Sequence, residues 1–230
     1  MKTVKPLRLF FIRHGQTEHF DRPPFNGWRD AQLTDFGRSQ LDQVAAGLAP
    51  VPFDAVYSSD LSRARYGGEQ LAKATGLTLR QSPQWREISF GRWEGLTYPQ
   101  IVEQDGDLIN RIFSFEGAPV PFPEGESYDM FADRIRGAFA ELRAQHPDGG
   151  RVALVAHSGV CKTLWGLLLN IPPHVAWRTV HQDFAAVNVA DIYPELCVAH
   201  LVNGYLGPEG YHAAGPGFER LAGDKIFKAE

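Results

Sequence analysis

The chain alternates short, almost wholly apolar runs with longer stretches in which apolar residues recur at helical spacing. Runs of the first kind are typical of strands buried on both faces of a sheet. They predict strands at residues 7–12, 53–57, 152–156, 186–192 and 197–202, with a short further strand at 77–79. Strands that alternate with helices indicate an α/β fold with a mostly parallel sheet.

Three stretches carry helix signals. Thr34 can cap a helix with apolar residues at 41, 44, 45 and 48, and Ser127 can cap another that ends before Pro147. The third covers residues 59–75, although Gly67 and Gly68 each cost about 1 kcal/mol relative to alanine inside a helix.

Residues 97–126 differ in character, because they combine phenylalanines, prolines and acidic residues. We interpret this segment as a lid inserted into a single domain spanning residues 1–230. Its phenylalanines and prolines are Phe113, Phe115, Phe122, Pro119, Pro121 and Pro123. The aromatic residues could form the core of a small subdomain or the face of a homodimer. After Gly204 no periodic pattern is found, so no element or role is assigned there.

Composition and charge exclude several classes of protein. With 43% hydrophobic and 22% charged residues among 230, the chain resembles an ordinary globular protein. No apolar run approaches the roughly 18–20 residues that span a bilayer, and the apolar stretch near the N-terminus is too short for a signal peptide. A net charge of −4, without a lysine or arginine run, argues against nucleic-acid binding. We therefore expect a cytoplasmic enzyme with no membrane or nucleic-acid partner.

Reactive side chains follow three predicted strands. Arg13 and His14 come after the first strand, Arg63 follows the second by about one helical turn, and His157 and Ser158 follow the third. Open α/β sheets bind ligands outside the carboxyl ends of their strands. If these strands are neighbours, two imidazoles and two guanidinium groups converge at one edge of the sheet.

This set of side chains suits phosphoryl transfer. A neutral imidazole can attack phosphorus, and covalent catalysis divides hydrolysis into transfer onto His14 and later attack by water. Arg13, Arg63 and protonated His157 would hold the migrating group, because guanidinium groups match pairs of phosphate oxygens. A helix that opens at Ser158 would add free amides that favour an anion.

Departure of an alcohol also requires a proton donor. Glu87 lies among aromatic residues in the stretch 85–95, where apolar surroundings favour the protonated carboxyl group. Alternatively, Glu87 could be an ion-pair partner of Arg86 or Arg92. No carboxylate stands at metal-ligand spacing to either histidine, and Cys161 and Cys197 fall in or beside apolar segments, so we expect no metal site and no disulfide.

These residues stand in five motifs, which in chain order are Arg13-His14-Gly15 with Thr17, Ser59-x-x-x-Arg63-Ala64, Glu87-x-x-Phe90-Gly91-x-Trp93-Glu94-Gly95, Pro123-x-Gly125-Glu126-Ser127 and His157-Ser158-Gly159. With them the chain resembles a known family, the histidine phosphatase superfamily of phosphoglycerate-mutase-like proteins. The resemblance implies a three-layer α/β/α sandwich and a phosphohistidine mechanism. The motif at 87–95 is similar to that of α-ribazole phosphatases and broad-specificity phosphatases.

The resemblance also assigns roles to residues. It implies that His14 is the nucleophile, that Arg13, Arg63 and His157 bind the phosphate, and that Glu87 donates the proton. It implies no metal and no organic cofactor, and a small phosphorylated metabolite as the substrate. Thr17 either caps a turn or contacts the phosphate together with Ser158.

Two positions depart from the family pattern. Gln16 stands where members usually carry glutamate, and Phe20 stands where they usually carry an asparagine that contacts the phosphate. Since a phenyl ring cannot hydrogen-bond a phosphate oxygen, Phe20 suggests an apolar or aromatic substrate rather than a small sugar acid.

Three functions follow in order of preference. The first is hydrolysis of a phosphomonoester, and the second is a phosphoglycerate mutase, which returns the phosphoryl group to another hydroxyl. The third is a catalytically weak binding or regulatory module on the same fold, which the residues at positions 16 and 20 make conceivable. Retention of all five core residues argues against the third.

Overall fold

The computed structural model describes residues 5–114, 120–207 and 210–212. One sheet has the strand order β3-β2-β4-β1-β5-β6-β7. The strands are β1 (Leu7–Arg13), β2 (Ala55–Ser59), β3 (Leu79–Ser82), β4 (Gly150–Ala156), β5 (Val187–Ile192), β6 (Cys197–Gly207) and β7 (Gly210–His212). Strands β1 to β4 are parallel, as predicted, whereas β5, β6 and β7 extend the sheet in antiparallel fashion.

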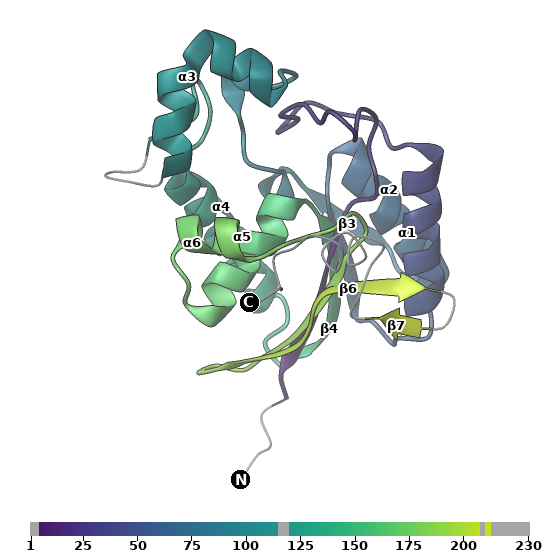
Figure 1. Cartoon of the computed structure of the whole chain (residues 1–230). Helices are drawn as coiled ribbons and strands as arrows, with labels where there is room; N and C mark the ends of the chain where they lie inside the picture. Colours follow the sequence, from purple (N-terminus) through teal and green to yellow (C-terminus); the bar gives the residue numbers. More distant parts are fainter. Residues whose placement is uncertain (1–4, 115–119, 208–209, 213–230) are drawn as a thin grey trace, which may run out of the picture.

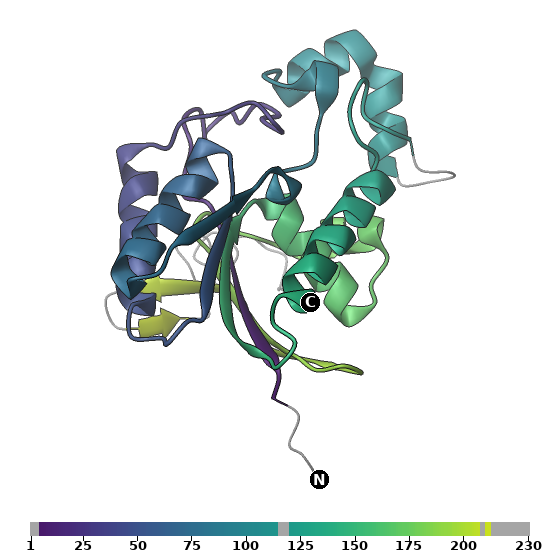
Figure 2. The ribbon, with the colours of Figure 1, turned by 180° about the vertical axis from the view of Figure 1, so that it is seen from behind.

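Helices cover both faces of this sheet and form a three-layer α/β/α sandwich (Figures 1 and 2). The helices are α1 (Asp35–Leu48), α2 (Ser62–Thr75), α3 (Tyr98–Ser114), α4 (Tyr128–Ala144), α5 (Ser158–Leu169) and α6 (Pro173–Thr179). Side chains of β1 alternate between the two layers. Leu9 and Phe11 pack in the core with α4 and α5, whereas Phe10 and Ile12 pack in the core with α1 and α2.

The predicted helix starts are confirmed by their caps. The Thr34 hydroxyl accepts a hydrogen bond from the Gly37 amide at the start of α1, and the Ser127 hydroxyl accepts one from the Met130 amide at the start of α4. Each bond satisfies one of the amides that a helix N-terminus leaves free. The boundaries of both helices are therefore set by the local sequence.

The paired glycines of α2 have a packing role. A Cβ atom at Gly67 would lie 2.9 Å from Leu41 Cδ2, and one at Gly68 would lie 2.8 Å from Ser58 Cβ. The Cβ atom of an alanine at either position would therefore lie closer to its neighbour than ordinary van der Waals contact allows. The glycines let α2 approach both α1 and the sheet, which offsets their low helix propensity.

The segment predicted as a lid contains α3, which lies at the end of the molecule toward which β1 runs, at the top of Figure 1. Its aromatic residues pack inward: the Phe122 ring centroid lies 4.8 Å from that of Phe90, 5.7 Å from Trp93 and 6.4 Å from Phe113. Phe122 belongs to the same buried cluster as Leu9 and Phe11 of β1, so these rings pack into the main core and not into a separate subdomain core. Phe115 and Pro119 lie outside the described residues.

Two predictions about elements need correction. Sequence patterns assign no element after Gly204, yet β6 continues to Gly207 and pairs with β7. An antiparallel edge ladder is held by backbone hydrogen bonds and needs no apolar run, so periodicity does not reveal it. The strand predicted at 77–79 instead begins at Leu79, because Gly76 in the left-handed region (φ 70°) ends α2 and residues 77 and 78 connect the two elements. Within the described ranges, no helix is long and apolar enough to cross a membrane.

Candidate active site

Strands β1 and β4 bring two histidines side by side. Arg13 pairs in register with Ala156 at the carboxyl ends of these parallel strands. The His14 amide donates to the Ala156 carbonyl at 2.9 Å, which places His14 beside His157. The centroids of the two imidazole rings are 5.3 Å apart.

His14 is buried, and its contacts define which nitrogen is free. Nδ1 lies 2.8 Å from the carbonyl oxygen of Gly15. Since a carbonyl can only accept, Nδ1 carries the hydrogen and Nε2 keeps its lone pair. Burial, and then the positive charges of Arg63 and Arg13, hold the pKa of His14 well below its usual value. The imidazole is therefore neutral near pH 7, with Nε2 as its nucleophilic atom.

His157 is fully buried at the start of α5. Among the residues that the structure describes, neither of its ring nitrogens has a hydrogen-bond partner, and the same holds for Nε of Arg13. A buried polar atom without a partner costs about 1–3 kcal/mol. Burial is also the main cause that holds the pKa of His157 well below its usual value. Nε of Arg13 and the protonated nitrogen of His157 are donors, so these two atoms suit a ligand with hydrogen-bond acceptors, and the second nitrogen of His157 becomes a third donor if a bound anion protonates the ring.

Two arginines supply the positive charge of the site. Burial lowers the pKa of Arg13 to about 10, which leaves the guanidinium charged at neutral pH. Arg63, in the first turn of α2, is 2% exposed and donates to the carbonyls of Arg29 and Gly27 at 2.8 and 2.7 Å. These carbonyls belong to the loop of residues 27–29. Glu94 holds that loop, because its carboxylate accepts the amides of residues 28 and 29. Both arginines act electrostatically on both histidines.

Glu87 is held at the N-terminus of α5. Its Oε2 accepts the Gly159 amide and its Oε1 accepts the Ile88 amide, each at 3.0 Å. A Cβ atom at residue 159 would lie 2.1 Å from Oε1 of Glu87. Glycine is therefore required at residue 159 for the carboxyl group to reach the free helix amide.

The alternative ion pairs of Glu87 are not formed. Arg86 makes two hydrogen bonds to Asp60, at 2.8 and 2.5 Å, and Arg92 binds Asp105 at 2.9 Å. Both arginines therefore have other carboxylate partners. The negative charge of Glu87 instead acts on the two arginines of the site.

The remaining predicted positions occupy the loop after His14 and the start of α5. Thr17 is buried and pairs through its backbone with Leu33, and Ser158 is the first residue of α5. Gln16 ties the loop to the cap of α1, because its side-chain oxygen accepts the Thr34 hydroxyl at 2.9 Å. Phe20 is 52% exposed. The roles of Thr17 and Ser158 in binding phosphate stay predictions.

Sequence patterns miss a segment that completes the site. The Arg13 guanidinium donates to the Gln182 carbonyl at 2.6 Å and lies 3.9 Å from the centre of the Phe184 ring. That ring is also 5.9 Å from the ring of His14. Since β5 runs antiparallel to β1, the residues before β5 lie at the carboxyl end of β1. Only knowledge of the strand direction would have placed them there.

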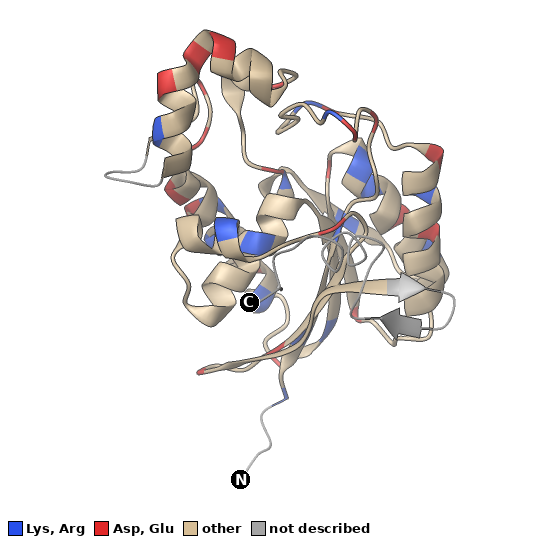
Figure 3. Cartoon of the chain, in the orientation of Figure 1, with Lys and Arg blue, Asp and Glu red and all other residues tan. Residues whose placement is uncertain are grey.

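The charges around the site are unevenly distributed. Figure 3 shows basic residues on α2 and α5, near the strand ends, while acidic residues gather on the outer part of α3.

Within the described part of the chain, no group of three or more His, Cys, Asp or Glu side chains could hold a metal ion. Burial raises the pKa of the Cys161 thiol, and Cys161 and Cys197 are both free thiols.

Known proteins share this fold and sequence pattern. The family model of the histidine phosphatase superfamily (branch 1) matches residues 9–204. The bifunctional protein Rv2228c of Mycobacterium tuberculosis is 32% identical over 87% of the chain, but the chain spans only 55% of that protein's length. The glucosyl-3-phosphoglycerate phosphatase of the same organism is 35% identical, over 74% of this chain and 78% of that protein. A solved structure of a mycobacterial glucosyl-3-phosphoglycerate phosphatase superposes with a TM-score of 0.78 and 28% identity, covering 86% and 99% of the two chains.

Proposed function

Because the chain belongs to the histidine phosphatase superfamily (branch 1), we propose that it hydrolyses a phosphomonoester through a phosphohistidine on His14. One observation carries this proposal. Among the described residues, Nε of Arg13 and both ring nitrogens of His157 are buried without a hydrogen-bond partner, and His157 lies beside a neutral His14 whose Nε2 keeps its lone pair. With the guanidinium groups of Arg13 and Arg63 beside them, these atoms suit a dianion with several acceptor oxygens.

In the first step the lone pair on Nε2 of His14 attacks phosphorus. The bond between phosphorus and the alcohol oxygen breaks, and Glu87 gives its proton to that oxygen. The positive charges of Arg13 and Arg63, with His157, stabilise the negative charge that spreads over the transferred oxygens. The products are the free alcohol and phosphorylated His14.

In the second step water attacks phosphorus while the Glu87 carboxylate accepts its proton. The phosphorus–nitrogen bond breaks, its electron pair returns to Nε2, and inorganic phosphate leaves. Glu87 and His14 are then restored to their starting states. The amides at residues 88 and 159 hold the Glu87 carboxyl group in one place for both steps.

A screen of phosphorylated metabolites tests this proposal. Free phosphate should be released from at least one ester, and His14→Ala should abolish the release. Glucosyl-3-phosphoglycerate belongs in the panel, since a relative is named for its hydrolysis. Formation of 2-phosphoglycerate from 3-phosphoglycerate without free phosphate would instead identify a mutase. No turnover of any ester would favour the binding or regulatory module.

Phe20 makes a separate prediction about specificity. Its exposed ring offers an apolar contact and no hydrogen bond to phosphate, so phenyl phosphate should be hydrolysed with a higher kcat/KM than 3-phosphoglycerate. Phe20→Asn should reduce this preference. Phe36→Asn is the matched control, because Phe36 is similarly exposed at the start of α1. Equal or better hydrolysis of 3-phosphoglycerate by the unmodified protein would refute the hypothesis.

A further inference from the structure

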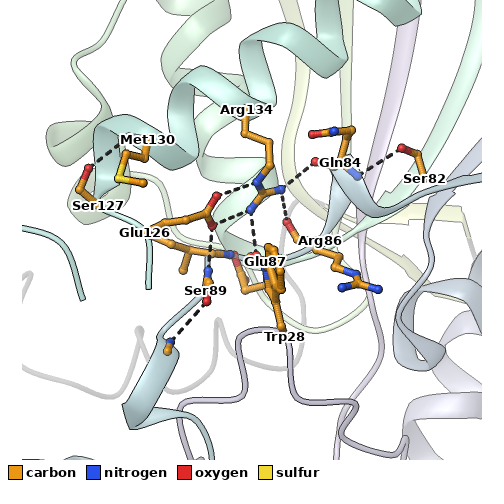
Figure 4. Close-up of polar contacts among 12 residues, drawn as sticks. Trp28, Ser82, Gln84, Arg86, Glu87, Ser89, Glu126, Ser127, Met130 and Arg134 are labelled. Carbon is orange, nitrogen blue, oxygen red and sulfur yellow. Dashed lines mark hydrogen bonds and ion pairs between the residues drawn. The ribbon is translucent and has the colours of Figure 1, made fainter. Parts of the chain in front are cut away.

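Arg134 on α4 is the centre of a partly buried polar cluster beside Glu87 (Figure 4). Its Nε and one Nη2 hydrogen bind the two carboxylate oxygens of Glu126, at 2.7 and 2.8 Å. Both side chains are only 14% exposed. A bidentate pair of this kind has a fixed geometry, because the guanidinium fork and the carboxylate are both planar.

The remaining three hydrogens of the guanidinium all bind the main chain before and at Glu87. Nη1 donates to the carbonyls of Gln84 and Arg86, at 2.8 and 3.0 Å, and Nη2 donates to the carbonyl of Glu87 at 3.1 Å. All five donors of Arg134 are thus used. A lysine has three donors and no planar fork, so it cannot reproduce this set.

Glu126 and Trp28 hold the same stretch from other sides. Glu126 Oε2 accepts the Ser89 amide at 2.9 Å, and the Glu126 amide donates to the Ser89 carbonyl at 3.0 Å. Trp28 Nε1 donates to the Glu87 carbonyl at 2.9 Å. The backbone of residues 84–89 is therefore fixed at four carbonyls and one amide, with Glu87 near the middle.

This arrangement bears on the direction of the Glu87 side chain. The Glu87 carboxyl group accepts the Gly159 amide of α5. The Glu87 carbonyl accepts hydrogen bonds from Arg134 of α4 and from Trp28. A shift of the backbone would move the carboxyl group relative to His14. Errors of about 1 Å in the placement of a reacting group can reduce a rate about 100-fold.

We propose that the Arg134–Glu126 pair is a positioning device for the proton donor Glu87, supported by the Trp28 indole. The inference rests on the proposed function of Glu87. It gives a use to the Pro123-x-Gly125-Glu126-Ser127 motif, which the chemistry at His14 does not employ. Loss of the pair should slow proton donation to the leaving group while leaving attack at phosphorus intact.

Two esters separate these effects. p-Nitrophenyl phosphate loses a phenolate that departs without a proton, whereas β-glycerophosphate loses an alkoxide that requires one. Arg134→Lys and Glu126→Gln should lower kcat/KM for β-glycerophosphate by about tenfold and change that for p-nitrophenyl phosphate less than about twofold. Glu87→Gln should show the same selectivity, with a loss of about 100-fold. In a protein that already carries Glu87→Gln, Arg134→Lys should add nothing.

Matched controls are available on the same helix. Arg136 forms an exposed ion pair with Asp133. Arg136→Lys and Asp133→Asn should therefore leave kcat/KM for both esters unchanged. Trp28→Phe keeps an aromatic ring at this exposed position and removes the donor to the Glu87 carbonyl, together with part of the indole that faces Arg86 and Arg134. Because residue 28 is exposed, this variant should fold even if the changes at Arg134 and Glu126 prevent folding. It should show the same selectivity as Arg134→Lys.

The possible outcomes distinguish the two proposals. If Glu87→Gln slows both esters equally, the general-acid role fails and the positioning proposal falls with it. Glu87→Gln could instead slow hydrolysis of β-glycerophosphate alone, while the other three variants slow hydrolysis of both esters equally or of neither. In that case only the positioning proposal is overturned. If Arg134→Lys and Glu126→Gln fail to fold, Trp28→Phe decides between these outcomes.

Discussion

At the scale of the residue, burial determines the chemistry of the two histidines. Desolvation disfavours the charged imidazolium, and two neighbouring guanidinium groups disfavour it further. His14 is thereby kept as a neutral imidazole near pH 7. A bound dianion would have the opposite effect on His157, because a negative charge favours its protonated form.

This depression of pKa predicts a dependence of stability on pH. Unfolded histidine binds a proton below about pH 6.5, whereas folded His14 and His157 do so only at lower pH. The unfolded state therefore binds more protons in that window, and the free energy of unfolding should fall as pH decreases below about 6.5. Each histidine contributes up to about 1.4 kcal/mol per pH unit.

Denaturant unfolding at several pH values measures this slope. His157→Asn removes one of the two groups, so its slope should be smaller than that of the unmodified protein by up to about 1.4 kcal/mol per pH unit. Equal slopes for the two proteins would show that His157 titrates alike in the folded and unfolded states.

The sequence identifies the site residues that follow strands. It does not identify residues such as Arg134, whose role depends on hydrogen bonds formed only in the fold. The structure brings Arg13, His14, Arg63, Glu87 and His157 together, as the motifs predict. Arg134 is a common type of residue on a helix surface, and nothing in its spacing distinguishes it from Arg136. Its five hydrogen bonds arise only when α4 packs beside residues 84–89.

At the scale of the element, glycines set how closely helices approach their neighbours. A Cβ atom at Gly137, inside α4, would meet nothing within 4 Å, whereas one at Gly67 in α2 would press on Leu41 and Val155. The same substitution in two helices should therefore have different effects.

Gly137→Ala should raise the free energy of unfolding by about 1 kcal/mol, because alanine is the better helix former. At Gly67 this gain should be cancelled or reversed, since overpacking costs about 1–3 kcal/mol. Thermal or denaturant unfolding of the two variants makes the comparison. A similar stabilisation by Gly67→Ala would mean that α2 can move away from α1 at no cost.

Element types are predicted from sequence better than their limits or directions. Buried strands such as β1 and β4 are recognisable because both faces are covered and nearly every residue is apolar. Strand β3 has mixed burial and no such run, so its limits are displaced. Helix α3 lies within a stretch of mixed aromatic, proline and acidic character, and the predicted lid therefore has no assigned elements.

At the scale of the whole molecule, a chain of net charge −4 concentrates positive charge where three strands end. In the proposed mechanism, arginine and histidine would supply the charge stabilisation that a metal ion gives in metal-dependent phosphatases. Phosphatase activity should therefore be unchanged after incubation with a chelator. Activity that disappears with the chelator and returns with a divalent cation would contradict this account of the site.

The central claim is that His14 becomes phosphorylated during turnover. Rapid acid-free denaturation in the presence of substrate, followed by mass spectrometry of the peptide that contains residue 14, tests it most directly. The account predicts one phosphoryl group on His14 that is stable in alkali and lost in acid, and none in His14→Ala. Full turnover with no phosphoryl group on His14, or undiminished turnover by His14→Ala, would contradict it.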